Sequence, residues 1–533
     1  MLAQTTGFIN GGNLINGVIE PIAESYFVST NPANQRDEIG KFPESSTADV
    51  ERACLAAKEA FQKWRNVPAP VRGQVLGRAA GLLREHKNSL AKLVTREIGK
   101  VPKEALGSVQ EAIDTAEFFL SEGRRLYGQT VPSEMRFKEL QTYRRPIGVC
   151  GIITAGNFPV AVPSWKIIPA LLCGNTIVWK PSQDAPATAM YFALILQAAG
   201  LPKGVLNVVQ GGASAGQSVL EMVESGLIQK IAFTGSSAVG KKIGEVCGRN
   251  LQVPTLELGG KNPLIVMEDA NLDLAVEGAL WAAFGTAGQR CTSLGNLILH
   301  QSIAAEFTER FLERVDALRI GDSTLEENVD YGPLMAPRFL EQFLAHFEMG
   351  KRDGATLLRG SQGRITAQNQ PDNFVGNPEQ GLFVFPTVWT DVKITMDIAQ
   401  TEIFGPTVNI LTAADFDEAI AIANGTLYGL SSAIYTNNPT YRNRFKTEIQ
   451  AGMSSINNST SGAEAHMPFG GVKASGNGTR ESGIWVLDSY TYWQAVNVDD
   501  SGGLQLAQIS TESLAGDEVA QEQLNTLFGQ KTP

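Results

Sequence analysis

Apolar residues recur at helical spacing through the first quarter of the chain, after a short β-like start. The run from 48 to 64 follows Thr47, which we predict to cap a helix. A second run spans residues 71–99, and a third spans 103–127. In each run the apolar positions return every three or four residues, which is typical of amphipathic helices.

The middle of the chain changes to short β-rich runs that alternate with helical runs. Runs at 148–154, 175–180, 205–210 and 230–235 come in series between about residues 143 and 253. Such βα units predict a parallel sheet with helices on both faces. A second series begins near residue 256, with β-rich runs at 263–267, 296–300, 407–413 and 431–436. The predicted fold class is therefore α/β.

Three segments stand outside this alternation. Residues 360–381 are polar and rich in glycine, asparagine and glutamine, so we expect a long surface loop there. After Asp499 the periodicity is lost, which predicts a mobile or partner-docked tail. The charge-free stretch 146–165 contains three prolines, which argues against a membrane span. With no secretory signal visible either, we expect a soluble, cytoplasmic protein.

Composition narrows the classes of function. The chain has 533 residues, 43% of them apolar, and a net charge of −11 from 44 basic and 55 acidic residues. This acidic balance argues against a dedicated binder of nucleic acid or of anionic membranes. The five cysteines are widely spaced and form no C-x-x-C pair, so neither a disulfide framework nor a cysteine-based metal site is predicted.

Two glycine clusters, at 210–216 and 233–242, each follow a predicted strand and open a helix. Glycine lets a backbone approach a phosphate, and the helix offers its N–H groups. Tight turns that merely need glycine are the alternative. The second cluster nearly matches a P-loop but has Lys242 where a hydroxyl would hold Mg²⁺, so a nucleoside triphosphatase stays a rival. Neither cluster has the G-x-G-x-x-G spacing.

Two residues are candidates for catalysis. Cys291 lies among small and polar residues beside Arg290, where its thiol is expected to be accessible with a lowered pKa. Glu257 lies between two leucines and before two glycines, as a base in a partly apolar site would. A packed structural cysteine and a surface carboxylate are the alternative interpretations.

In combination, these residues resemble the aldehyde dehydrogenase superfamily. The matching motifs occur in the order of that family between about residues 30 and 495, and together they are very specific. They also account for the second glycine cluster without a P-loop. The motifs are Asn157-Phe158-Pro159, Trp179-Lys180-Pro181-Ser182, Phe233-Thr234-Gly235-Ser236, Glu257-Leu258-Gly259-Gly260-Lys261, Gly288-Gln289-Arg290-Cys291, Glu402-Ile403-Phe404-Gly405-Pro406 and Pro468-Phe469-Gly470-Gly471.

The resemblance implies oxidation of an aldehyde to its acid with NAD or NADP. Cys291 matches the nucleophile, which forms a thiohemiacetal and then a thioester. Asn157 matches the side-chain donor of the oxyanion hole, and Glu257 matches the base that activates water. Acyl transfer to coenzyme A and a non-enzymatic protein of the same fold, like the crystallin-like members, are the alternatives. The presence of all three residues favours the hydrolytic enzyme.

The resemblance also implies the residues that bind the cofactor. Lys180 matches the lysine at the adenosine ribose, and Glu402 matches the carboxylate at the nicotinamide ribose. Many NAD-preferring members carry glutamate where this chain has Gln183, which removes a repulsion toward a 2′-phosphate. We therefore expect NAD as the main cofactor, with NADP tolerated and no metal. The other expected cofactor residues are Thr154, Ser182, Gly212, Gly216, Phe233, Thr234, Gly235, Ser236, Leu258 and Phe404.

The substrate pattern looks like the branch that includes α-aminoadipic semialdehyde dehydrogenases. In that branch an arginine before the nucleophile and a glutamate on an early helix hold an amino-acid head group; Arg290 and Glu111 match them. Ser461, Gly462 and Ala463 are further substrate candidates. Thr292 and Ser293 depart from members that carry more arginines there. We expect a semialdehyde that bears a carboxylate.

By resemblance, a Rossmann-like, parallel-sheet NAD(P)-binding domain covers 1–127 and 148–256, and an α/β catalytic domain covers 257–455. A small β arm for oligomerisation covers 128–147 and 483–499. Residues 456–482 return to line the active site, and 500–533 form the tail. Family members pair into dimers or tetramers through the arm, so we expect a homodimer or homotetramer.

Overall fold

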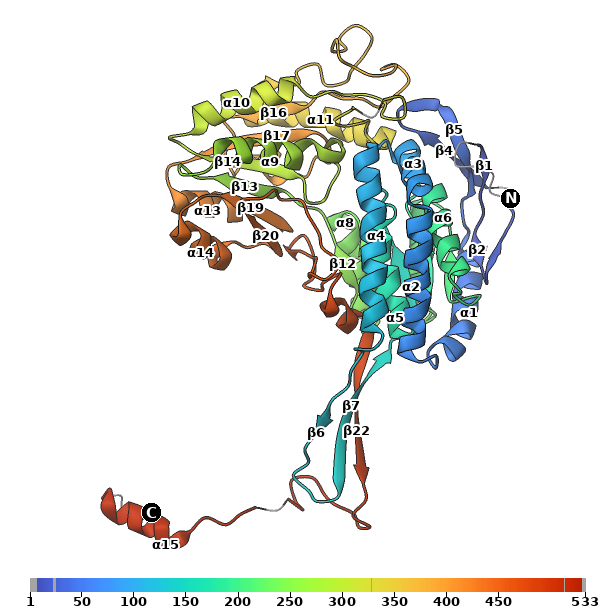
Figure 1. The fold of residues 1–533 in the computed structure, drawn as a ribbon, viewed down its shortest axis with the longest axis vertical. Helices are drawn as coiled ribbons and strands as arrows, with labels where there is room; N and C mark the ends of the chain where they lie inside the picture. The colour runs from blue at the N-terminus through green and yellow to red at the C-terminus, as the bar shows by residue number, and fades with distance from the viewer. Residues whose placement is uncertain (1–6, 23–24, 327, 512, 530–533) are drawn as a thin grey trace. The chain divides into compact units, whose positions relative to one another are not determined.

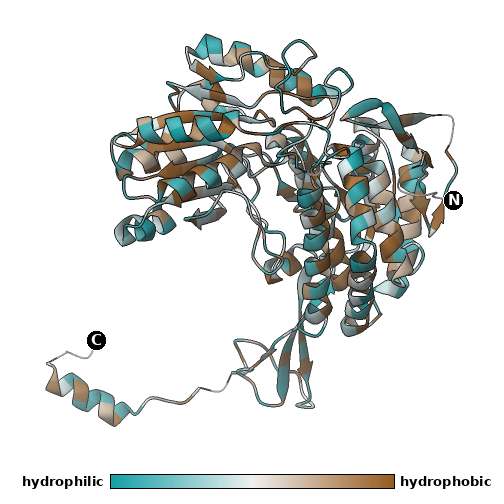
Figure 2. Ribbon diagram, turned by 45° about the horizontal axis from the view of Figure 1, so that its top comes forward, coloured by the Kyte–Doolittle hydropathy of each residue, from teal (hydrophilic) through white to brown (hydrophobic). Residues whose placement is uncertain are grey.

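The computed structural model describes residues 7–22, 25–326, 328–511 and 513–529. The chain divides into two compact units. The first comprises Met1–Arg125 and Pro146–Thr491, and the second comprises Leu126–Arg145 and Tyr492–Pro533. Figure 1 shows the first unit as sheets covered by helices. Figure 2 shows hydrophobic residues gathered in the strands and in stripes along the helices, whereas the loops are largely hydrophilic.

One seven-stranded sheet of the first unit carries the predicted βα series. Its order is β12-β11-β8-β9-β10-β2-β3, and its five strands from β12 to β10 run parallel. The short strands β2 and β3 pair antiparallel at one edge. The strands are β2 Leu14–Ile15, β3 Val18–Ile19, β8 Val149–Ile153, β9 Thr176–Lys180, β10 Leu206–Val208, β11 Lys230–Thr234 and β12 Thr255–Glu257.

Helices connect these parallel strands, as right-handed crossovers require. They are α5 Ala161–Cys173, α6 Pro186–Ala198, α7 Ala213–Glu224 and α8 Ser237–Arg249. All residues of α5, β8 and β9 are buried, which fits their charge-poor sequences. The carboxyl ends of β8 to β12 therefore meet at one edge of the sheet, where open α/β sheets bind their ligands.

A second seven-stranded sheet has the order β15-β16-β17-β14-β13-β19-β20 and is parallel except for β15. Its strands are β13 Asn262–Val266, β14 Leu294–His300, β15 Thr356–Arg359, β16 Thr387–Thr390, β17 Thr407–Ala413, β19 Ser431–Tyr435 and β20 Met453–Ile456. Its helices are α9 Leu272–Phe284, α10 Ala304–Asp316, α11 Pro337–Asp353, α12 Asp397–Gln400, α13 Phe416–Asn424 and α14 Pro439–Glu448. The predicted α/β class is confirmed by these two sheets.

The N-terminal part adds a three-stranded sheet, β1 Ile9–Asn10, β5 Asn34–Pro43 and β4 Tyr26–Asn31. Four helices follow: α1 Thr47–Trp64, α2 Ala69–Glu85, α3 Lys87–Ile98 and α4 Pro102–Glu122. The cap of α1 is Ser46 and not Thr47, because the Ser46 hydroxyl and the Asp49 carboxylate each accept from the other's backbone N–H. The run 71–99 is two helices, since the backbone of His86 leaves the helical region.

The polar segment 360–381 is a long loop without a helix or a regular strand. It is anchored nonetheless, because Ile365 and Val375 are buried and the backbone of Val375 pairs with Gly321. Elsewhere in the first unit, β18 Tyr428–Gly429 pairs with β21 Val472–Lys473, and Ile484–Ser489 forms a 3₁₀ helix. The loop is therefore part of the folded surface of the first unit.

The second unit holds a three-stranded sheet in the order β22-β7-β6. The strands are β6 Thr130–Val131, β7 Lys138–Pro146 and β22 Thr491–Asp499. The prediction of an aperiodic tail after Asp499 was incomplete, because Glu518–Leu527 form α15 with Asp517 as its cap. The sequence did not predict this helix because its apolar residues are few, and none of its side chains is buried. Within the described residues, we find no helix long and apolar enough to cross a membrane.

Candidate active site

The predicted nucleophile Cys291 lies on a loop between α9 and β14. The loop begins with the 3₁₀ turn Gly285–Gly288, in which Thr286 and Ala287 have φ of 54° and 52° and Gly288 has φ of 68°. Left-handed backbone at two consecutive residues with side chains is costly and persists only where the surroundings hold it. The structure should therefore contain groups that fix this turn.

Two buried side chains hold the turn. The carboxylate of Glu104, on the first turn of α4, accepts from the Thr286 backbone N–H at 2.9 Å and from its hydroxyl at 3.0 Å. The side chain of Gln289 donates to the carbonyl of Thr286 at 3.2 Å and accepts from the N–H of Met335 at 2.8 Å. A helix remote in sequence thus fixes the loop that presents Cys291.

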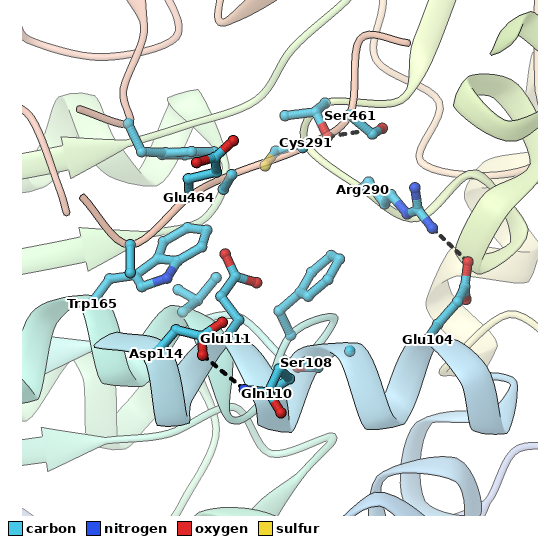
Figure 3. A pocket seen from close by; sticks show the side chains of 18 of the residues that line it. Glu104, Ser108, Gln110, Glu111, Asp114, Trp165, Arg290, Cys291, Ser461 and Glu464 are labelled. Carbon is cyan, nitrogen blue, oxygen red and sulfur yellow. Dashed lines mark hydrogen bonds and ion pairs between the residues drawn. The ribbon is translucent and has the colours of Figure 1, made fainter. Parts of the chain in front are cut away.

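The surroundings of the thiol correct one expectation. The guanidinium of Arg290 turns away from Cys291, pairs with Glu104 and lies 4.2 Å from the ring centre of Trp281 (Figure 3). Burial, followed by the negative charges of Glu402 and Glu257, raises the pKa of Cys291 to about 12. The lowered pKa expected from the neighbour in sequence is therefore wrong for this structure, in which the thiol is protonated at neutral pH.

Asn157 follows β8 and reaches the same loop. Its side-chain amide donates to the carbonyl of Gln289 at 2.9 Å, two residues before Cys291. The residue is buried, so this amide has little competition from water. The structure thus brings together Asn157 and Cys291, which are more than a hundred residues apart in the chain.

Glu257 ends β12 and is 3% exposed. Among the described residues, neither carboxylate oxygen makes a well-formed hydrogen bond, although the backbone N–H of Gly471 points toward it. Burial raises the pKa of this carboxyl to about 8, opposed by the positive charges of Lys166 and Arg480. A buried, poorly solvated carboxylate with a pKa near neutral is well suited to take a proton from water.

The expected cofactor residues gather at the carboxyl ends of the parallel strands. Lys180 ends β9, and its ammonium donates to the carbonyls of Gly211 at 2.9 Å and Gly212 at 3.3 Å. Burial lowers its pKa to about 8. Gly212 caps α7, and a Cβ at Gly212 would lie 2.5 Å from the amide oxygen of Gln183. The turn before α7 is therefore kept free of side chains.

The neighbouring strand ends supply the other expected contacts. Thr154 follows β8 and accepts from the indole N–H of Trp179 at 3.0 Å. Ser236 caps α8, and Gly235 lies so close to the ring of Phe233 that a Cβ would clash. Ser182 donates to Asp184, and Thr234 ends β11, where its buried hydroxyl has no partner among the described residues. Gly216 is in the first turns of α7, and Leu258 packs against Gly240.

A third group comes from the second sheet's side of the site. Glu402 accepts from the N–H of Gly260 at 3.1 Å, and burial raises its pKa to about 7. Phe404 has φ of 58°, and its ring lies 5.4 Å from that of Phe339. The glycine turn before α7 is free of side chains, and the carboxylate of Glu402 acts on Cys291 from the other side of the site. This arrangement fits a dinucleotide.

Cys291 opens onto a cavity of about 680 Å³. Figure 3 shows Glu111 pointing from α4 into the same space as the sulfur of Cys291. Burial raises the pKa of Glu111 to about 8, so it is no ordinary exposed helical glutamate. The expected substrate residues Arg290, Ser461, Gly462 and Ala463 also line this cavity. The Ser461 and Thr292 hydroxyls lie 3.3 Å apart.

Sequence reasoning missed much of the cavity wall. Trp165, Trp281 and Phe118 project from helices whose sequences are typical of ordinary core helices, and His466 lies outside the motifs recognised in the sequence. Phe469 was inside a recognised motif, and its ring lies 4.7 Å from that of Trp165. The aromatic side chains of the cavity wall are therefore seen only in the structure, because no sequence pattern predicted that they would meet there.

Comparison with known proteins agrees with this geometry. The model of the aldehyde dehydrogenase family matches residues 19–496. An α-ketoglutarate semialdehyde dehydrogenase of Haloferax volcanii is 39% identical over 491 residues, which cover 91% of this chain and 98% of that protein. An α-ketoglutaric semialdehyde dehydrogenase of Bacillus subtilis is 38% identical, covering 88% and 93%.

Solved structures give the same result. A betaine aldehyde dehydrogenase variant of Staphylococcus aureus in complex with NAD⁺ is 30% identical, with a TM-score of 0.88 over 94% of this chain and 99% of that one. An NAD-dependent aldehyde dehydrogenase of Sinorhizobium meliloti is 32% identical, with a TM-score of 0.88 over 95% and 97%. The chain therefore belongs to the aldehyde dehydrogenase family, as an oxidoreductase that oxidises aldehydes with NAD.

Proposed function

We propose that this enzyme oxidises a semialdehyde bearing a carboxylate, through a thioester on Cys291 that water hydrolyses. The observation that carries the proposal is the meeting of three separate segments at Cys291: Asn157 bonds to the loop of Cys291, and the charge of Glu257 acts on its thiol. Cys291 itself lines a cavity that Arg290 also lines. The two semialdehyde dehydrogenase relatives support the substrate class, since the semialdehyde in their names bears a carboxylate.

The first half of the reaction belongs to Cys291 and Asn157. The thiolate of Cys291 attacks the aldehyde carbonyl, and its own pKa requires that a base first take the thiol proton. The amide of Asn157 and the backbone N–H of Cys291 donate to the developing oxyanion. Because Asn157 is already held against the nucleophile loop, little reorganisation is needed at that moment.

NAD, when bound, supplies the hydride acceptor. Lys180, Gln183, Gly212, Ser236 and their neighbours at the strand ends would hold its adenosine and phosphate half. Glu402 would hold the nicotinamide ribose, since its carboxylate lies beside the nucleophile loop and is fixed by Gly260. These groups orient the cofactor, and the buried walls exclude water.

The second half of the reaction belongs to Glu257. Its carboxylate takes a proton from water, which attacks the thioester and releases the acid and the Cys291 thiol. A raised pKa makes Glu257 a stronger base than an ordinary glutamate, and the buried pair of Lys166 and Glu481 lies next to it. Glu257 thus favours hydrolysis over transfer of the acyl group to coenzyme A.

Arg290 and Glu111 are the proposed contacts for the substrate carboxylate. The Nε and Nη2 atoms of Arg290 are held by Thr286 and Glu104, whereas Nη1 has no hydrogen-bond partner among the described residues and is left for a ligand. Glu111, with its pKa of about 8, is mainly protonated at pH 7 and donates a hydrogen bond. Ser461, Gly462 and Ala463 close the same wall.

The test compares initial rates of reduced nicotinamide formation across an aldehyde panel. We expect 2-oxoglutarate semialdehyde or aminoadipic semialdehyde to exceed hexanal and benzaldehyde in kcat/KM, and Cys291→Ala to abolish all turnover. Arg290→Gln is expected to raise KM for the semialdehyde and leave that for hexanal nearly unchanged. Faster turnover of the neutral aldehydes would contradict the substrate class, and addition of coenzyme A that yields acyl-coenzyme A would contradict hydrolysis.

We also infer a homodimer or homotetramer that works in the cytoplasm. The exposed aromatic and apolar side chains of the second unit, including Tyr492, Trp493 and Val498, support pairing through this arm. Cys291 must stay reduced to act as the nucleophile, which supports a reducing compartment. Light scattering on the purified protein tests the assembly; a monomeric mass at micromolar concentration would contradict it.

A further inference from the structure

The peptide between Gly211 and Gly212 is held from two sides by opposite charges. Lys180 donates to the carbonyls of both glycines. The carboxylate of Glu44 accepts from the N–H of Gly212 with both oxygens, at 2.9 and 3.1 Å. A Cβ at Gly211 would lie 3.0 Å from Glu44. Glu44 is thus in the corner formed by Lys180, Gln183 and the cap of α7.

The backbone fixes Glu44 in this place. Glu44 follows β5 directly, and its N–H donates to the carbonyl of Ser25 at 3.1 Å. The next residue, Ser45, donates to the carbonyl of Gln210 at 3.2 Å and is buried. Glu44 itself is only half-buried, and its carboxylate lies at the Gly211–Gly212 peptide that Lys180 contacts from the other side. The charge is therefore positioned at this peptide.

The other carboxylate of this corner is neutralised. Asp184 pairs with Arg338 and accepts from Ser182. Gln183 carries no charge, although its amide oxygen lies over Gly212. Glu44 forms no ion pair with any described residue within 4.0 Å, and only the ammonium of Lys180 acts on the same peptide from the other side. Glu44 is therefore the carboxylate of this corner that has no ion-pair partner among the described residues within 4.0 Å, and the ammonium of Lys180 acts on its charge only from a greater distance.

We propose that Glu44 is a cofactor-selecting residue. Its carboxylate, held at Gly212, repels the 2′-phosphate of NADP, which the neutral side chain of Gln183 cannot do. The inference rests on the proposed placement of the adenosine ribose at Lys180 and Gln183. A ribose 2′-hydroxyl can donate to the Glu44 carboxylate, whereas a 2′-phosphate brings a second anion close to it. The enzyme then discriminates against NADP, contrary to the tolerance expected from Gln183 alone.

The test measures cofactor binding as well as turnover. In Glu44→Gln, the side chain keeps an oxygen for the N–H of Gly212 but loses its charge. We expect the ratio of kcat/KM for NADP to that for NAD to rise about tenfold or more. Calorimetry should show tighter binding of adenosine 2′,5′-bisphosphate to the variant and nearly unchanged binding of 5′-AMP. Glu38→Gln, which removes the same charge from an exposed residue of β5, is the matched control and should leave the kcat/KM ratio and both binding affinities unchanged.

Four outcomes separate the possibilities. A wild-type enzyme that uses NADP as well as NAD, or a ratio unaffected by Glu44→Gln in a variant of unchanged melting temperature, overturns the role of Glu44. An equal shift in Glu38→Gln also overturns it, because the effect would then follow net charge alone. If Lys180→Ala weakens neither cofactor, the proposed ribose site itself fails, which is distinguishable from a failure at Glu44.

Discussion

At the residue scale, the thiol of Cys291 lies among groups that keep it protonated in the free enzyme. Burial and the charges of Glu402 and Glu257 raise its pKa to about 12, so the thiolate fraction grows as pH rises. We predict slow alkylation by iodoacetamide at pH 7 that accelerates steadily up to pH 10. Glu402→Gln should speed alkylation at pH 7 by about tenfold, the equivalent of one pKa unit.

Mass spectrometry of the labelled peptides, with Glu348→Gln as an exposed control of the same charge change, checks this prediction. Labelling that is already complete at pH 7 in the absence of cofactor would contradict the raised pKa. The other four cysteines are buried, so they should label more slowly than Cys291.

Glu257 predicts a distinct pH dependence. Its pKa of about 8 is above that of an ordinary glutamate, so the basic carboxylate is lost as pH falls through 8 and is fully present well above it. Where hydrolysis limits turnover, kcat should rise between pH 6.5 and 9 with an apparent pKa near 8. Glu257→Gln should lower kcat by about 10²-fold or more and abolish that limb of the profile. A flat profile in the wild type would refute the assignment.

At the element scale, the first turn of α4 fixes the left-handed turn that precedes the nucleophile. Glu104 is the shared acceptor for Thr286 and Arg290. In Glu104→Gln, the loss of these charge-assisted bonds should cost about 1–3 kcal/mol of unfolding free energy. It should also lower kcat by about 10–100-fold, since small misplacements of a reacting group are expensive.

Because Glu104 acts through the loop, KM for NAD should change little, and the iodoacetamide rate of Cys291 should change together with kcat. A variant with reduced stability but normal kcat would show that α4 only stabilises the fold. Glu85→Gln, which removes the same charge from an exposed residue at the end of α2, is the control.

The strands illustrate what can be predicted from sequence. The runs at 148–154, 175–180 and 230–235 are β8, β9 and β11, because short apolar runs bounded by turns have few other solutions in a βα series. Residues at their carboxyl ends had to meet at one edge. The role of Glu104 could not be predicted, because a helix–loop contact across 182 positions leaves no local pattern. The same holds for the direction of Arg290, whose partner is remote in the chain.

At the scale of the whole molecule, the two units should tolerate different changes. The helix α15 buries none of its side chains, and the family model ends at residue 496. We predict that a chain ending at Asp499 keeps its melting temperature within about 2 °C and its kcat/KM within about twofold, since surface residues outside the core add little to stability. Differential scanning fluorimetry and steady-state kinetics check this. A large loss of activity would show that the tail contributes to the catalytic unit.

Cys291 forms a thioester with the substrate, and Glu257 activates the water that hydrolyses it. The most direct test of this central claim is peptide mass spectrometry of Glu257→Gln after incubation with NAD and the semialdehyde. We predict one equivalent of reduced nicotinamide per active site and an adduct on the peptide that contains Cys291. The adduct should increase the mass of that peptide by the mass of the aldehyde less two hydrogen atoms. Stoichiometric reduced nicotinamide without an adduct on Cys291, or with the acyl group on another residue, would contradict the account.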